Sequence, residues 1–285
     1  MTGKPSLETK KIRTFPPPPK DFDPFAASQK DLLRHGLPLR PDPQIQPGMA
    51  ALWEKQAARY RHFDHIEPRL AATLAPKPVL TIPSIGPDPI ESCGYQLFSS
   101  AAPFIALFAT FTVPDLHFSP GGIGPNQFHT FVGIGFLDLH VEMTVDSNQN
   151  VTSQITAQGT PVNNMPVRPG DVISCSMCLD NKPPATARFF IANETTSQTT
   201  NFQFDSGFPP AVTVNAGVTR GGFNFPVHPL ARFGIVYFDE ISAYTTNGFR
   251  SLTSGQAITM VEGNKTLARP DRISDFTFKA NFVAA

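Results

Sequence analysis

The sequence predicts an all-β protein, with an antiparallel two-sheet β-sandwich over residues 91–285 behind a Pro-rich, partly helical N-terminal extension over residues 1–90. First, from about Ser92 the apolar residues recur with a period of two, in short runs separated by turn residues. Second, that part has almost no helical pattern. Third, hydrophobic residues make up 40% of the chain and charged residues only 16%, and the 25 Phe supply apolar area for a core.

The extension contains two predicted helices between Pro-rich stretches. The prolines of residues 15–42 exclude long helices there. Ser28 as an N-cap and Gly36 as a stop predict a short helix, and residues 47–63 predict a second one. We interpret its apolar stripe as packing on the β-domain rather than as a cofactor site. Residues 71–90 are a predicted linker.

The β-domain contains eleven predicted runs of strand. The first, residues 105–113, ends at Pro114, and turn residues separate the others. The others are residues 128–136, 139–145, 151–157, 171–179, 185–193, 200–204, 211–214, 232–238, 257–261 and 275–283. Many short strands are typical of a sandwich or barrel.

The charge balance and the targeting signals limit which partners and which location we expect. Lys+Arg and Asp+Glu balance at 23 each, so nothing favours nucleic acid or an anionic membrane surface. Residues 1–20 lack the apolar region of a secretory signal, and the apolar run 101–113 is too short to span a bilayer. We therefore expect a cytoplasmic protein, although export by a non-classical route would leave no such trace.

The cysteines and histidines predict neither a metal site nor a cofactor. Cys175 and Cys178 have C-x-x-C spacing, but they lie in a predicted strand, where residues three apart point to opposite faces. With Cys93 they make an odd count, so we expect three free thiols. The seven histidines are scattered, and none forms a ligand pair with a cysteine.

An ordered set of phrases resembles the glutamic peptidases, also called eqolisins. Residues 109–114 read Ala-Thr-Phe-Thr-Val-Pro and residues 130–135 read Thr-Phe-Val-Gly-Ile-Gly, with Phe131 in place of the family's Trp. Residues 167–173, 187–196, 215–216, 231–238, 258–260 and 276–278 resemble later strands and turns of the family. The resemblance implies a bent, concanavalin A-like sandwich over about 190 residues.

The resemblance also implies an acid endopeptidase mechanism, but this chain departs from the family at the catalytic pair. In the family a Glu and a Gln activate a water and stabilise the tetrahedral intermediate, which requires a carboxyl and an amide donor. The position of the Glu is Gly217, and the best match to the Gln is His140. The aromatic and second acidic residues that follow the Glu correspond to Val218 and Gly221.

Other residues of the chain offer a rearranged pair. Alternation along residues 138–146 places His140 and Glu142 on one face, where they could act as an acid/base pair or simply form a solvated polar face. An amide could come from Gln149, Gln154 or Gln158, and the spacing selects none of them.

Two functions of different class follow. The first is a non-catalytic member that binds a peptide, a glycan or a protein subunit in the former substrate cleft. The second is an acid endopeptidase with a rearranged pair, so enzymatic activity stays open. A structural role in an assembly, for instance a homo-oligomer strapped by the Pro-rich arm of residues 1–48, is a third interpretation. The predicted cleft is lined by Phe131, His140, Glu142, Asn215, Gly217 and Arg220, with the guanidinium favouring an anionic or carbonyl-bearing ligand.

Overall fold

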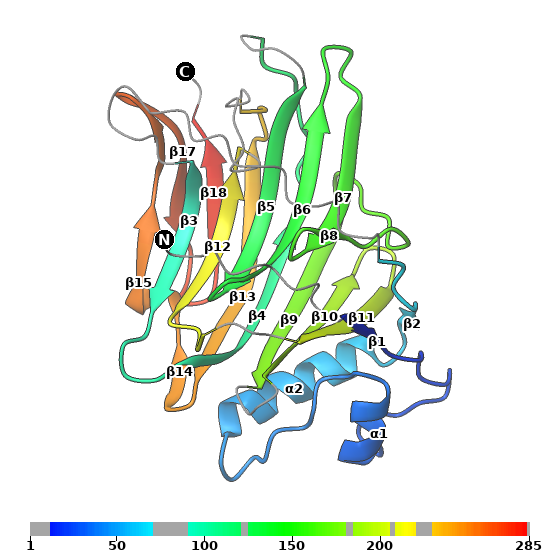
Figure 1. The fold of residues 1–285 in the computed structure, drawn as a ribbon. Coiled ribbons are helices and arrows are strands. Elements are labelled where there is room, and N and C mark those ends of the chain that lie inside the picture. Colours follow the sequence, from blue (N-terminus) through cyan, green and yellow to red (C-terminus); the bar gives the residue numbers. More distant parts are fainter. Residues whose placement is uncertain are drawn as a thin grey trace, which may run out of the picture.

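Two antiparallel β-sheets pack face to face in the computed structural model of the chain (Figure 1). The structure describes residues 12–70, 91–120, 125–180, 185–205, 209–220 and 230–283. The predicted all-β sandwich is confirmed. The two α-helices, of 6 and 14 residues, both lie in the N-terminal extension.

The smaller sheet has seven strands and carries the segments that resemble the catalytic strands of the family. Each named pair in it is antiparallel. In spatial order its strands are β15 (Gly255–Ile258), β3 (Ser92–Phe98), β12 (Thr213–Thr219), β5 (Asn126–Ile134), β6 (Leu137–Val145), β7 (Val151–Ala157) and β8 (Thr160–Pro161).

The larger sheet has eleven strands and receives the N-terminal extension. Its main path is β1 (Ile12–Thr14), β11 (Gln198–Asp205), β10 (Thr186–Asn193), β9 (Val172–Asp180), β4 (Phe104–Thr112), β13 (Ile235–Thr245), β18 (Phe278–Phe282), β17 (Lys265–Arg272) and β16 (Met260–Glu262). Off this path, β14 (Gly248–Arg250) pairs with β13, and β2 (Asp64–His65) pairs in parallel with β11. A 3₁₀-helix, η1, covers Leu252–Ser254.

The core lies between the sheets and is rich in phenylalanine, as the composition predicts. Along β5 the side chains of Phe128, Val132 and Ile134 are buried in it, whereas the alternate side chains lie on the outer face. In the larger sheet the rings of Phe238 and Phe278 stack with centroids 4.5 Å apart. The alternation therefore decides which residues of the smaller sheet are available to a ligand.

The extension packs on the outer face of the larger sheet, as predicted. The first helix, α1 (Gln29–Arg34), is fixed by a capping box between Ser28 and Asp31. The second, α2 (Pro47–Tyr60), buries Trp53, Gln56 and Tyr60. Because β1 and β2 both pair with β11, the described part of the extension leaves and rejoins the sheet at the same strand (Figure 1).

A network of charged side chains joins α2 to the larger sheet. The Arg59 guanidinium contacts Glu194 at 3.0 Å and Glu240 at 2.8 Å. Tyr60 donates to Glu194, and Lys55 pairs with Glu240. Burial alone would raise the pKa of Glu240, but hydrogen bonds from Arg59 and Lys55, together with their charges, hold it below its ordinary value.

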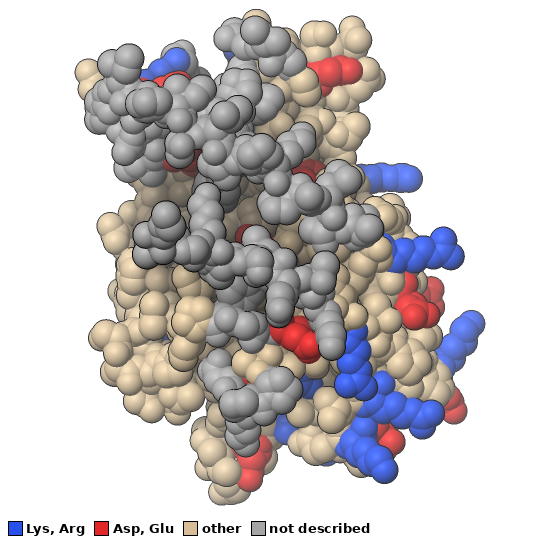
Figure 2. All heavy atoms as spheres, viewed as in Figure 1, with Lys and Arg blue, Asp and Glu red and all other residues tan. Residues whose placement is uncertain are grey.

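Basic side chains gather on the same part of the molecule. Figure 2 shows Lys and Arg mainly at the lower right of the view, where Figure 1 places α1, α2 and β2. The first 70 residues hold 12 basic and 8 acidic side chains, leaving 11 basic and 15 acidic for the rest. Several of these basic groups are engaged by acceptors of the protein itself, including Arg40 and Arg59.

Some strands differ from the prediction. The sequence pattern gave no strand bounds for β3 or β17, and the predicted strand 211–214 covers only the start of β12. In β17 the misleading residue is Pro270, which cannot donate to a ladder. It lies beyond the segment that pairs with β16, so no hydrogen bond to that strand is lost.

The three cysteines are free in the structure. Cys175 lies in the core, whereas Cys178 is three residues further along β9 and lies near Ser176 on the other face. The alternation that predicted separate thiols therefore holds. Among the described residues, no helix combines the length and apolar character needed to cross a membrane.

Candidate functional site

The outer face of the smaller sheet brings together most of the predicted cleft residues. Strand register places Gly217 of β12 opposite Phe131 of β5, and Phe131 opposite His140 of β6. On the next strand, His140 is paired with Thr156. The two positions that the sequence analysis matched to the family's Glu and Gln therefore lie in one row across the sheet, separated by the Phe131 ring.

Gly217, which the sequence analysis matched to the family's glutamate, has no room for a side chain. Gly217 pairs with Gly94 of β3, and a Cβ added to Gly217 would lie 2.3 Å from the Cys93 carbonyl oxygen. A Cβ on Gly94 would lie 2.0 Å from the Ala216 carbonyl oxygen. Both contacts are with backbone, which cannot rotate aside as a side chain could. The close approach of β3 and β12 therefore requires glycine at both positions.

The position matched to the family's glutamine holds a histidine with partners of its own. His140 Nε2 lies 3.3 Å from Asp138 Oδ2, and the imidazole stacks on Phe131 with centroids 5.7 Å apart. His140 Nδ1 is buried and has no hydrogen-bond partner. This nitrogen is therefore an unsatisfied polar atom beneath the surface of the face.

Glu142 lies on the same face as His140, but the two side chains take different partners. Its carboxylate accepts hydrogen bonds from Gln154 Nε2 at 3.0 Å and from Thr156 Oγ1 at 2.8 Å. The expected His140–Glu142 pair is thereby replaced by two separate pairs, His140–Asp138 and Glu142–Gln154. Of the three glutamines offered by the sequence, the structure selects Gln154 as the neighbour of the carboxylate.

His129 is a member of the face that the sequence analysis missed. Register places it opposite Glu142, and its ring meets the His140 ring edge-on at 5.6 Å. Burial lowers its pKa to about 4, with a smaller lowering effect of His140 and an opposing effect of Glu142. Because side chains alternate along a strand, counting two residues back from Phe131 would have identified His129 as a residue of the same face.

Asn215 joins the face, whereas Arg220 does not. Asn215 is half-buried and is paired in register with Gln96 of β3 and Gly133 of β5. Arg220 is only 5% exposed, and its guanidinium lies 2.8 Å from Glu91 and 3.3 Å from Glu262. The expectation that Arg220 lines the cleft is corrected, because strand parity and two carboxylates hold it elsewhere. Gly221, the position of the family's second acid, lies outside the described residues.

The chemistry available on this face is that of amides, imidazoles and carboxylates. Within the described ranges, no cluster of three or more His, Cys, Asp or Glu is arranged to hold a metal ion. The face offers hydrogen-bond donors and acceptors beside one aromatic stack.

Comparison with known proteins assigns the family. The Peptidase A4 family pattern matches residues 91–279, and the chain therefore belongs to the Peptidase A4 family, the glutamic peptidases. No curated protein matches the chain significantly.

Two solved structures share the fold. A crystal structure of scytalido-glutamic peptidase with a transition-state analogue inhibitor is 17% identical, with a TM-score of 0.54, and the match covers 68% of this chain and 98% of that one. SCP-B, an eqolisin-family peptidase solved with the tripeptide Ala-Ile-His, is 16% identical with a TM-score of 0.53 and the same coverage. At these identities the likeness shows the fold.

Proposed function

We propose that the outer face formed by β12, β5 and β6 binds peptides without cleaving them. The observation that supports this most directly is the close approach of Gly217 to the Cys93 carbonyl, which leaves no space for a carboxyl side chain where the family's glutamate stands. Glycine cannot accept or return a proton, so the family's mechanism has no general base at this position.

Peptide is the ligand that the remaining side chains suit best. An extended peptide offers N–H and C=O groups that amide side chains can bind, and Asn215 and Gln96 lie side by side in register on this face. The stacked rings of Phe131 and His140 offer an apolar surface for one side chain of the ligand. The complex of SCP-B with Ala-Ile-His adds support from a protein of the same fold.

The state of His129 also favours binding over acid proteolysis. Its pKa lies near 4 because the half-buried ring is partly desolvated, so acid conditions place a poorly solvated charge in the middle of the face. We therefore expect the face to work best near neutral pH, outside the range in which an acid endopeptidase acts.

The test combines digestion with binding. Purified protein is incubated with denatured casein from pH 2 to pH 7, and mass spectrometry should find no new peptides. Fluorescence anisotropy with a library of labelled peptides at pH 7 should give saturable binding that Phe131→Ala weakens at least fivefold. Tyr237→Ala removes an exposed aromatic ring from the other sheet and should leave binding unchanged. Cleavage by the wild type, or equal effects of the two variants, would overturn the proposal.

One observation favours a second candidate, an acid endopeptidase with a relocated pair. Glu142 and Gln154 are a carboxyl and an amide 3.0 Å apart on the same face. In this reading Glu142 would activate the water and Gln154 would stabilise the oxyanion. The hydrogen bonds that already occupy the carboxylate weigh against it.

The variants Glu142→Gln and Glu194→Gln separate the two candidates. Both remove one partly buried carboxylate, but only Glu142 lies on the proposed site. If wild type digests casein below pH 5 and only Glu142→Gln abolishes the activity, the second candidate is correct. Activity that survives in Glu142→Gln would exclude the relocated pair.

A further inference from the structure

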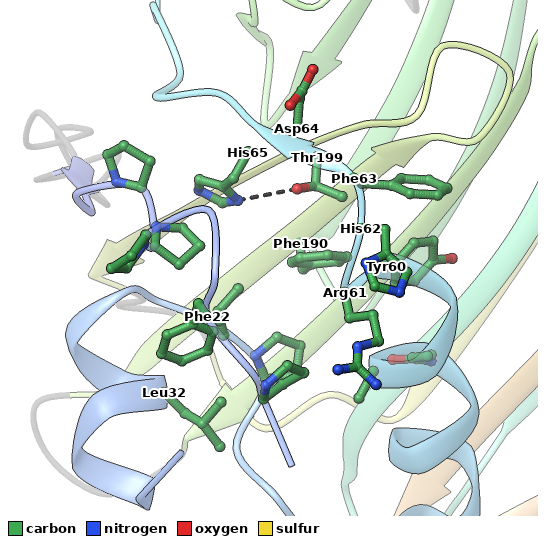
Figure 3. Close-up of a pocket in the computed structure, with 18 of the residues that line it drawn as sticks. Phe22, Leu32, Tyr60, Arg61, His62, Phe63, Asp64, His65, Phe190 and Thr199 are labelled. Atoms are coloured by element: carbon green, nitrogen blue, oxygen red, sulfur yellow. Dashed lines mark hydrogen bonds between the residues drawn. The ribbon is translucent and has the colours of Figure 1, made fainter. Parts of the chain in front are cut away.

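A cavity of about 520 Å³ lies between the N-terminal extension and the larger sheet, away from the face discussed above (Figure 3). The extension supplies most of its wall, and Phe190 of β10 and Thr199 of β11 supply the sheet side. Its volume lies in the range of small-molecule sites, which are about 300–1,000 Å³. The space therefore suits a single small molecule.

Aromatic rings make up much of the apolar lining. Tyr60 packs against Phe63 and Phe190, with ring centroids 5.2 Å and 5.4 Å apart, and Figure 3 shows Phe22 to the left of these three rings. The apolar lining also includes Pro17, Pro18, Pro19 and Trp53. Flat faces from several directions suit a planar ligand.

Contacts that do not depend on a ligand hold this wall in place. The Arg40 guanidinium donates to the Pro24 carbonyl at 2.9 Å and lies 5.0 Å from the Trp53 ring centroid. Trp53 Nε1 in turn donates to the Pro38 carbonyl at 2.8 Å. The cavity is therefore built before any ligand arrives, which keeps the entropic cost of binding low.

Gln56 places an amide without a partner in the wall of the cavity. It lies on α2 between Trp53 and Tyr60, three and four residues away, so the three side chains share the helix face that packs on the sheet. Gln56 is only 7% exposed and lines the cavity. Within the described part of the chain, its amide makes no hydrogen bond, yet neither amide atom is sealed from solvent. The accessible surface of the amide therefore faces the cavity.

The other polar groups of the wall have partners or lie towards solvent. Tyr60 donates to Glu194, and His65 Nδ1 lies 3.1 Å from Thr199 Oγ1, the contact drawn in Figure 3. The second ring nitrogen of His65 is buried and has no surface on the cavity. The remaining polar lining residues are exposed and include both signs of charge: Lys20, Arg61, His62 and Asp64. They therefore do not select a charged ligand.

The Gln56 amide determines the chemistry of the complementary ligand. A glutamine side chain presents a C=O acceptor beside an N–H donor. A ligand edge that carries an N–H donor beside a C=O acceptor satisfies both groups at once, as the edge of a lactam or a carboxamide does. An unpaired amide within an apolar wall is unfavourable, so a ligand that completes its hydrogen bonding gains affinity.

We propose that this cavity binds a neutral, planar aromatic lactam or carboxamide whose N–H and C=O pair with the Gln56 amide. The site is independent of the peptide-binding face, because it is built from the extension and the opposite sheet. Failure of one proposal therefore leaves the other intact.

Two matched probes test the proposal on the full chain. The first is 2-quinolone, a fused aromatic lactam, and the second is its N-methyl derivative, which has the same rings but no N–H donor. Isothermal titration calorimetry measures both affinities. In the wild type 2-quinolone should bind about tenfold more tightly than the N-methyl derivative, the effect of completing the amide's hydrogen bonds.

The variant Gln56→Leu tests the role of the amide. It keeps the size of the side chain and removes both polar atoms, so the two probes should bind this variant equally. Because the amide has no partner in the described part of the protein, Gln56→Leu should melt no lower than the wild type. Gln44→Leu makes the same change at an exposed position outside the lining and should keep the wild-type preference.

A second pair of variants tests the location of the bound probe. Ala57 lines the cavity, so Ala57→Phe should fill it and abolish binding, whereas Ala58→Phe adds the same ring at an exposed position of α2 and should leave binding unchanged. A thermal melt checks folding, and Ala57→Leu replaces Ala57→Phe if the larger ring prevents folding. Trp53 is the only tryptophan of the chain and lines the cavity, so the bound probe should quench its fluorescence.

Three results would overturn the proposal. The first is that 2-quinolone gives no saturable binding to the wild type. The second is that a folded Ala57 variant binds it as the wild type does. The third is that Gln56→Leu keeps the preference for 2-quinolone, which would trace that preference to the bulk of the methyl group rather than to the amide.

Discussion

The two outer faces of this sandwich carry different chemistry. The face of the smaller sheet holds Gly217 and His140, the positions that the sequence analysis matched to the catalytic pair of the glutamic peptidases. The face of the larger sheet is covered by the extension, and it carries a charge network and a cavity. The smaller sheet therefore carries the candidate site, whereas the extension brings Lys55 and Arg59 and most of the cavity wall to the larger sheet.

The largest effect should come from acid, which acts on both faces. His129 and His65 have pKa values near 4 in the folded protein against 6.5 ordinarily. The unfolded chain thus takes up protons at higher pH than the folded one, and stability falls as the pH drops from about 6.5 towards 4. The pKa of Glu240 lies below its ordinary value of 4.5, so the protein loses further stability as the pH falls below 4.5.

We expect this loss of unfolding free energy to exceed that of any single substitution below. Urea unfolding midpoints measured from pH 8 to pH 3.5 check this prediction. His129→Gln and His65→Gln should each weaken the dependence of the midpoint on pH. A midpoint that stays constant between pH 7 and pH 4 would contradict the neutral, buried state of both histidines.

The second prediction tests the glycine pair of the smaller sheet. Gly217→Ala should lower the unfolding free energy by about 2–3 kcal/mol, because overpacking against backbone forces β3 and β12 apart. Asn215→Ala, two residues away on the same strand and face, should cost less than about 0.5 kcal/mol. Urea melts measure both. For the same reason Gly217→Glu combined with His140→Gln should yield no peptidase.

The third prediction tests the charge network of the covered face. Arg59→Met should cost about 2 kcal/mol, since it leaves Glu194 and Glu240 without their shared cation in a partly buried setting. Arg61→Met is the matched control. Arg61 is two residues further along and makes an exposed contact with Asp23 at 3.9 Å, so its loss should cost within about 0.5 kcal/mol. Urea melts measure both variants. If their unfolding free energies are equal, the charge network does not stabilise the covered face.

The smallest effect concerns the three thiols, which have no role in the proposed function. Burial raises the pKa of Cys93 to about 12 and also raises those of Cys175 and Cys178. Thiol reagent at pH 8 should therefore react slowly with the native protein and find three thiols after denaturation without reductant. A count of one would mean that a disulfide has formed.

Local patterns in the sequence were enough for most of the strands, for both described helices and for the family. Alternation along residues 138–146 correctly placed His140 and Glu142 on one face, because the direction of a strand side chain depends only on parity. Ser28 and Gly36 correctly bracketed α1, because capping is a local interaction. The match of Gly217 to the family's glutamate rests on the motif alone and stays a prediction.

The tertiary structure alone decided which distant groups meet. Arg220 is held by Glu91 and Glu262, and Arg59 by Glu194 and Glu240, pairs far apart in the chain that no spacing rule connects. The cavity exists because the extension folds back onto β10 and β11. Parity and capping act over a few residues and can be predicted from them, whereas ion pairs and cavities depend on how whole layers stack.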